Sequence, residues 1–172
     1  MCQAQRSPNA HTRCEKTVRK LSEKPVSIIL SAVTPDIWEL SPGSRWGLRS
    51  DYYFHWEFES RWYRFLIPAG FEFDGASVPW FLRWIAGRGR FGLLAPLVHD
   101  WLHAQKGSVA VDWDAEGTWV RHYFASDFTR QEADKMFFLI MRYDGVEPRW
   151  LRRCAYKAVR LWSIIKRDAW EN

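Results

Sequence analysis

The sequence is poor in the features that would assign it quickly to a class of protein. It has three cysteines, Cys2, Cys14 and Cys154, and no Cys-x-x-Cys pair, which argues against a disulfide framework or a cysteine-based zinc site. No run reaches the roughly 18 apolar residues of a membrane-spanning helix, and the N-terminus lacks the apolar core of a signal peptide. We therefore expect a reducing, cytoplasmic setting.

Aromatic residues, in contrast, are abundant, with 12 Trp and 11 Phe among 172 residues. A chain of this length corresponds to about one domain, since domains usually hold roughly 100–200 residues. Aromatic side chains bury large areas, so the simplest interpretation is a small core filled by few, large side chains. An aromatic surface for a membrane interface or a partner is the alternative.

The net charge of +5 is unevenly distributed. Residues 1–26 carry six Lys or Arg against two Glu, and residues 147–172 carry seven against three acidic residues, so each end is +4 and residues 27–146 are −3. Basic ends can hold the phosphates of lipid or nucleic acid. A nucleic-acid role would rest on these ends alone and would give salt-dependent, sequence-independent binding, so nucleic acid is the less favoured partner.

Two kinds of pattern follow one another along the chain and predict an α+β fold. Aromatic and β-branched residues dominate from Trp46 to Phe73, as is typical of half-buried strands, and a shorter β-rich run covers 26–32. After Pro79, apolar residues at helical spacing predict helices at 80–86, 93–104, 129–142 and 148–166. We therefore expect a small antiparallel β-sheet followed by a compact bundle of three to four helices.

Composition sets the expected boundaries of the domain. Residues 1–26 are polar and aperiodic, which predicts a disordered basic extension, and residues 167–172 form a tail. Residues 27–166 then form a single domain. Residues 107–127 look like an insertion in it, either a loop or a hairpin.

Two of the expected helices carry further signals. Thr129 and Glu132 have the spacing of a capping box, which marks the start of a helix. The last helix is amphipathic, with basic residues opposite an apolar face. Its expected apolar face comprises Trp150, Leu151, Cys154, Ala155, Leu161, Trp162 and Ile165.

The adjacent pair His99–Asp100 is the strongest candidate for a functional site. It lies in an otherwise apolar helix, where an unpaired carboxylate would be costly. Histidine suits proton transfer near neutral pH, and Asp134 on the next long helix can reach His99 if the two helices pack antiparallel. We expect His99, Asp100 and Asp134 to be catalytic; the alternative is a His–Asp hydrogen bond that only holds the helices together.

Other residues could support or extend this site. His103 lies one helical turn after His99, and the two could form a two-His, one-carboxylate metal site with Asp134. Asp74 and Ser77, at a strand-to-helix junction, are candidates for binding a ligand or for supporting the catalytic residues, with helix capping as the alternative for Ser77. A phosphohydrolase of the His-Asp superfamily would need another upstream His, and the nearest one, His55, lies in an expected strand.

Several blocks in this order resemble one family of small phage and prophage proteins, domain-of-unknown-function family 1353. They are Pro68–Phe71, Asp74–Pro79, His99–Leu102, Thr129–Asp134 and Tyr156–Arg160. The resemblance covers about residues 61–163. It implies a phage or prophage setting, in the bacterial cytoplasm or associated with the virion, and it supplies no activity. Members of that family usually carry Tyr at the position of His103, so a His99–His103 metal pair would not be general to it.

The site is also similar, more distantly, to phospholipases of the A2 type, which use adjacent His-Asp on one helix and an Asp on an antiparallel helix. This similarity implies that His99 activates water, Asp134 orients His99, and Asp100 binds calcium or another divalent metal. The basic helix 149–166 would then meet an anionic lipid surface. The alternative is a non-catalytic accessory or structural phage protein, in which that helix binds a phage structural protein.

Overall fold

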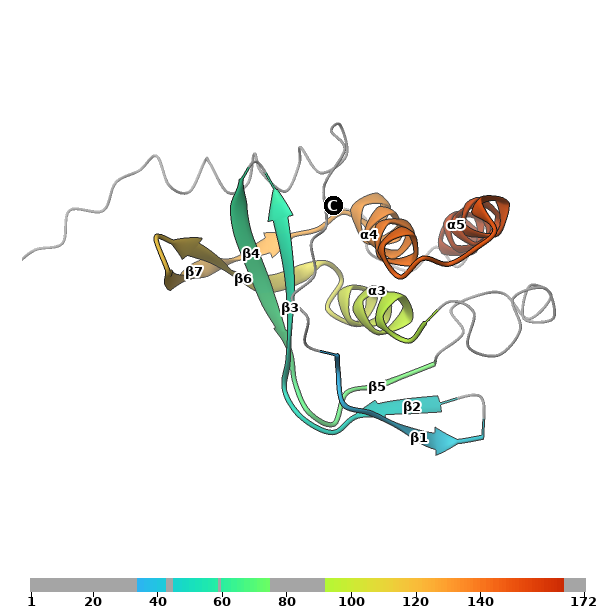
Figure 1. Cartoon of the computed structure of the whole chain (residues 1–172), viewed down its shortest axis with the longest axis horizontal. Helices are drawn as coiled ribbons and strands as arrows, with labels where there is room; N and C mark the ends of the chain where they lie inside the picture. Colours follow the sequence, from blue (N-terminus) through green and yellow to red (C-terminus); the bar gives the residue numbers. More distant parts are fainter. Residues whose placement is uncertain (1–33, 43–44, 59, 75–91, 166–172) are drawn as a thin grey trace, which may run out of the picture.

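The computed structural model describes residues 34–42, 45–58, 60–74 and 92–165, apart from the side chains of 121–127 and Ser163 (Figure 1). Antiparallel strands come first along the chain and three helices dominate its second half, so the predicted α+β class is confirmed. The expected strand at 26–32, the expected helix at 80–86 and the terminal segments lie outside the described residues.

The strands form two sheets, although the sequence led us to expect one. The three-stranded sheet has the order β1-β2-β5, from strands Ile37–Ser41, Arg45–Leu48 and Glu72–Phe73. The four-stranded sheet has the order β3-β4-β6-β7, from strands Tyr52–Phe58, Arg61–Ile67, Ser108–Ala115 and Thr118–Asp127. The chain turns at Gly70, where φ is +80°, and β5 then pairs with β2 instead of extending the other sheet.

The hairpin β3–β4 supplies much of the core. Alternate residues of both strands are buried, and Phe54 lies opposite Phe65 in the register. The ring of Trp56 packs 5.7 Å from that of Phe65. Full burial of one such side chain is worth about 1.5–3 kcal/mol, which explains why a small domain uses so many aromatic residues.

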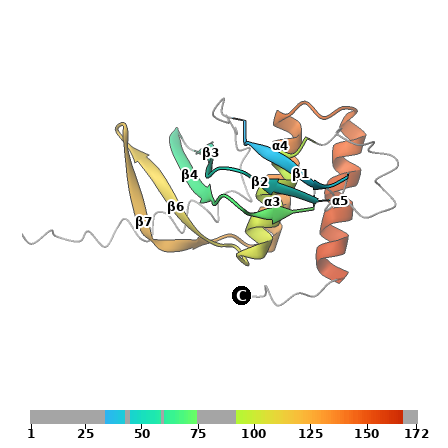
Figure 2. The same cartoon turned by 90° about the horizontal axis from the view of Figure 1, so that it is seen from below.

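The expected insertion at 107–127 is a hairpin made of β6 and β7. It belongs to the four-stranded sheet, because β6 pairs with β4 through Val111 and Phe65. Its two ends meet, since Phe128 N–H donates to the Gly107 carbonyl at 3.0 Å. Figure 2 shows that it extends away from the last helix.

Helix α4 (Arg130–Tyr143) packs against both α3 (Leu94–Ala104) and α5 (Arg149–Ile165) (Figures 1 and 2). The predicted capping box of Thr129 and Glu132 is present at the start of α4. None of the described helices combines the length and apolar character that a bilayer span requires.

Helices α3 and α4 run antiparallel, as contacts at both ends show. Gly107 follows α3 and bonds to Phe128, just before α4. Gly92 precedes α3 and lies against Asp144 at the end of α4; a Cβ on Gly92 would come within 2.8 Å of Asp144 Oδ2. The antiparallel packing brings the C-terminal half of α3 beside the first turns of α4.

The expected apolar face of α5 is wrong in part. Leu151, Ala155 and Val159 are the apolar residues that α5 buries, with Arg152 beside them. Other members of the expected face are exposed: Trp150, Cys154, Leu161, Trp162 and Ile165. The helix carries apolar residues on more than one side, and α4 covers only one of them.

Candidate functional site

Helix α3 buries His99 because its neighbours along the chain are apolar. Leu97, Val98 and Leu102 are fully buried and fix the helix against the core. On another part of the helix, the ring of Trp101 packs edge-on at 5.0 Å from Phe71, next to β5. His99 is thereby held on the side of α3 that faces α4, with 5% of its surface exposed.

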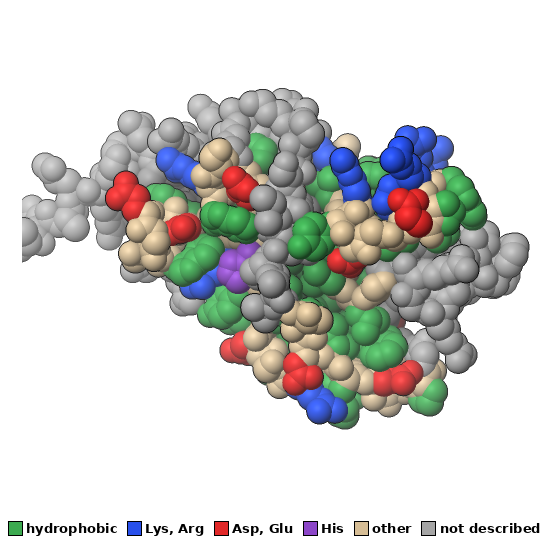
Figure 3. Space-filling view, in the orientation of Figure 1, with side chains coloured by type: hydrophobic (Ala, Val, Ile, Leu, Met, Phe, Trp, Pro, Cys, Tyr) green, Lys and Arg blue, Asp and Glu red, His purple; other side chains and the backbone are tan. Residues whose placement is uncertain are grey.

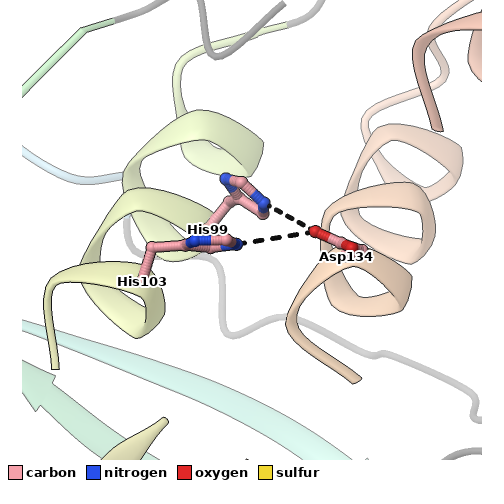
Figure 4. Close-up of side chains that lie close together, drawn as sticks. All are labelled: His99, His103 and Asp134. Carbon is pink, nitrogen blue, oxygen red and sulfur yellow. Dashed lines mark hydrogen bonds and ion pairs between the residues drawn. The ribbon is translucent and has the colours of Figure 1, made fainter. Parts of the chain in front are cut away.

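Asp134 on α4 meets His99 directly. The Nε2 atom of His99 lies 3.0 Å from Asp134 Oδ1, and both residues are buried (Figure 4). The other ring nitrogen of His99, Nδ1, lies 3.3 Å from Asp100 Oδ1. The structure therefore brings together all three residues that we expected to be catalytic.

His103 contacts the same carboxylate one turn along α3. Its Nε2 lies 3.5 Å from Asp134 Oδ1, and its ring centroid is 4.1 Å from that of His99. Figure 4 shows both imidazoles pointing from α3 toward Asp134. The side chain of His103 is 29% exposed, so the cluster has one edge open to solvent.

Arg160 of α5 completes the cluster, and sequence reasoning missed it. Its guanidinium donates to Asp134 Oδ2 at 3.0 Å. We had expected the basic residues of the last helix to lie opposite its apolar face. Arg152, Tyr156 and Arg160 are spaced four residues apart at the border of the face that α5 buries, and the rotation of α5 that makes this a border is not visible in the sequence.

Electrostatics make Asp134 the centre of the site. Burial alone would raise the pKa of Asp134, but hydrogen bonds from His103, His99 and Arg160 hold it well below its usual range. A carboxylate with no exposed surface needs such compensation. Asp134 is thus an anion that three side chains from two other helices contact.

The two histidines respond in opposite ways. Burial by itself would lower the pKa of His99, but the hydrogen bonds and charges of Asp100 and Asp134 raise it to about 9. Burial lowers the pKa of His103, and the nearby charge of His99 adds to this. At neutral pH the cluster therefore combines protonated His99 with the anion of Asp134, which also accepts from Arg160.

The donor set decides which metal could bind. His99, His103 and Asp134 each offer a ligand atom, and these atoms lie within 4.8 Å of one another. Two imidazoles and one carboxylate suit zinc or iron. Asp100 would then accept a hydrogen bond from His99 Nδ1 and orient this ligand without binding the metal itself. Calcium takes six to eight oxygen ligands. Among the described residues, the carboxylate of Asp100 lies 3.3 Å from His99 Nδ1, so calcium binding by Asp100 stays a prediction.

Two further residues, Asp74 and Ser77, were expected to support this site. Asp74 directly follows β5 and is exposed, so a supporting role for it stays a prediction. Ser77 lies outside the described residues.

Comparison with known proteins gives one match. A family model described as "Protein of unknown function (DUF1353)" matches residues 46–159, more than half of the chain. The matched range includes all of α3 and α4 and most of α5, but ends just before Arg160. No curated protein and no solved structure matches the chain.

Proposed function

We propose that this chain, which belongs to the DUF1353 family, is a hydrolase of ester or lipid substrates with His99 as its general base. One observation carries the proposal. The buried carboxylate of Asp134 holds His99 Nε2 at 3.0 Å, which leaves Nδ1 on the side of Asp100. The side chain of Asp100 is 18% exposed and that of Asp134 is fully buried, so Nδ1 is the nitrogen nearer to solvent.

The chemistry follows from this orientation. In its neutral form His99 keeps the proton on Nε2, donated to Asp134, and offers the lone pair of Nδ1. A water beside Asp100 gives a proton to Nδ1 while its oxygen attacks the ester carbonyl. The imidazolium that forms is stabilised by Asp134, and its proton then passes to the leaving alkoxide. The antiparallel His-Asp arrangement supports the likeness to phospholipase A2.

An assay of purified protein on phospholipid vesicles and on soluble esters tests the proposal, with calcium, zinc or EDTA in separate arms. His99→Gln is expected to lower kcat/KM by roughly 10²–10⁴-fold, the usual contribution of a general base. His55→Gln, on β3, is the matched control and is expected to keep the activity. Absence of turnover by folded wild-type protein in every arm would remove the hydrolase.

A second candidate is a non-catalytic accessory or structural protein, and a separate observation favours it. Both ring nitrogens of His99 already face carboxylates, and Arg160 balances the second charge. The cluster would then join three helices without reacting. This candidate expects His99→Ala to lower the melting temperature of a protein that has no turnover; an unchanged melting temperature would count against it.

We also propose a phage or prophage setting, in the host cytoplasm or on the virion. The ordered sequence blocks that resemble phage and prophage proteins support it. Mass spectrometry of purified virions and of the cytosol of induced host cells distinguishes the two locations. Recovery in neither fraction would argue against the setting.

A further inference from the structure

One side of α5 carries a stripe of apolar residues that are exposed and not buried in the hydrophobic core. Trp150 is 54% exposed, Leu161 57% and Ile165 61%. At 3.6 residues per turn, these positions and the exposed Cys154 project to the same side of the helix. We call Trp150, Cys154, Leu161 and Ile165 the apolar stripe of α5.

A row of cations runs beside this stripe. Arg149, Arg153 and Lys157 are spaced four residues apart and are all exposed, so they lie along one line of the helix surface. The helix 149–165 contains five Lys or Arg and no Asp or Glu. In Figure 3, Lys and Arg side chains lie next to hydrophobic ones over the region of α5.

Packing fixes where the stripe and the cations lie relative to the site. Leu151, Ala155 and Val159 face α4 and are buried, and the exposed apolar stripe lies outside this face, beside it on the helix surface. Arg160 sits at the border and reaches Asp134. Going around the helix from Arg160, the row of cations comes first and the apolar stripe follows it. The cations therefore lie nearer to the His99–Asp134 cluster than the stripe does.

We propose that α5 binds an anionic lipid surface, lying flat with the apolar stripe in the interface and the cations on lipid phosphates. An amphipathic helix with Trp and aliphatic residues beside Lys and Arg is suited to this binding mode. Charge complementarity favours an anionic bilayer, because α5 offers cations only. On this inference, α5 is the surface with which the hydrolase meets its lipid substrate, and this part of it rests on the proposed function.

Sedimentation of the full chain with vesicles tests this inference. Vesicles of phosphatidylcholine with phosphatidylserine are expected to bind the protein at low salt, and phosphatidylcholine alone much less. High salt is expected to release it, because screening weakens the cations' contribution. Charge reversal in Arg153→Glu/Lys157→Glu is expected to weaken binding by about tenfold or more, and Trp150→Ala/Leu161→Ala to weaken it as well.

Matched variants outside α5 serve as controls. Lys106→Glu/Arg142→Glu changes charge equally at exposed positions, and Trp38→Ala/Val120→Ala removes apolar groups that are 42% and 40% exposed. Both are expected to bind as the wild type does. Equal binding by the α5 variants and wild type, no binding to anionic vesicles, or a stable dimer that buries α5 and ignores vesicles would each overturn the inference. His99→Gln is expected to bind normally, so loss of catalysis and loss of lipid binding are separable.

Discussion

The carboxylate of Asp134 has two oxygens and faces donors from α3 and α5, His99, His103 and Arg160. Its removal would leave His99 and Arg160 as buried or half-buried cations with one anion fewer. We expect Asp134→Asn to lower the free energy of unfolding by about 3–5 kcal/mol, as when one partner of a buried ion pair is lost. Urea denaturation measures this. Glu116→Gln, at an exposed position, is the control and is expected to change stability by less than about 0.5 kcal/mol.

The raised pKa of His99 makes stability depend on pH in a definite direction. The folded-state pKa of about 9 exceeds the ordinary value of 6.5, so the folded protein holds this proton more tightly than the unfolded chain. The resulting stabilisation, on the order of 3 kcal/mol, is fully present below pH 6.5 and is lost as the pH rises through about 9. Unfolding free energies measured from pH 6 to 9.5 are expected to fall in the wild type and to be flatter in His99→Gln.

Catalysis has the opposite pH dependence, because only neutral His99 is a base. Burial lowers the pKa of His99, and the hydrogen bonds and charges of Asp100 on α3 and Asp134 on α4 raise it to about 9. On the proposed function, kcat/KM rises with pH toward about 9. A rate that is flat between pH 6 and 9 would argue against His99 as the base.

Residue 103 distinguishes a hydrogen-bonding role from metal binding. A Tyr hydroxyl could donate to Asp134, whose Oδ1 lies 3.5 Å from His103 Nε2, but it is a poorer ligand for zinc. We expect His103→Tyr to keep stability within about 1 kcal/mol, whereas His103→Leu loses that interaction and costs about 1–2 kcal/mol. Thermal unfolding compares the two. If His103→Tyr keeps its stability but loses activity, this would point instead to a metal bound by His99, His103 and Asp134.

Among the elements, the hairpin β6–β7 offers a direct test of turn chemistry. Glu116 and Gly117 occupy its tip with φ of +56° and +86°. A two-residue turn with positive φ at both positions prefers Asn-Gly, because Asn tolerates this backbone better than Glu does. We expect Glu116→Asn to raise stability by up to about 1 kcal/mol and Gly117→Ala to lower it by a similar amount. Chemical denaturation of both variants checks the sign.

Local signals explain how far the elements could be predicted. The strands of β3 and β4, the capping box at Thr129 and the start of α5 after Pro148 follow from short-range patterns, and the structure agrees. The second sheet could not be predicted, because β5 pairs with β2 through contacts between residues distant in sequence. The orientation of α5 was wrong because the helix has two apolar sides, and sequence alone does not say which of them α4 covers.

In the candidate site, likewise, the pairing of His99 with Asp134 could be predicted from the sequence and the contact of Arg160 could not. His99 and Asp134 could be paired in advance because each is a polar residue beside an apolar stripe, on helices that a hairpin-sized insertion connects. Arg160 could not, because the rotation of α5 decides whether it faces solvent or Asp134. A basic residue on a basic helix gives no local sign of a buried partner.

At the scale of the whole molecule, one hydrophobic core joins every layer. It includes Leu48 and Phe73 of the three-stranded sheet, Phe65 of the other sheet, Leu97 of α3 and Val159 of α5. Because the described layers share this core, we expect unfolding in a single cooperative step. Tryptophan fluorescence and far-ultraviolet circular dichroism should give coincident urea transitions. Separate midpoints would show that a sheet or helix layer unfolds on its own.

Arg160 comes from the last described helix, whereas His99 and Asp134 come from earlier ones. A ribosome adds about 5–20 residues per second, so α3 and α4 leave it before α5 does. Until α5 packs, the hydrogen bond from Arg160 to Asp134 Oδ2 cannot form. On the proposed function, a nascent chain therefore carries no mature site until its helix layer is complete, and the timing of synthesis itself delays activity.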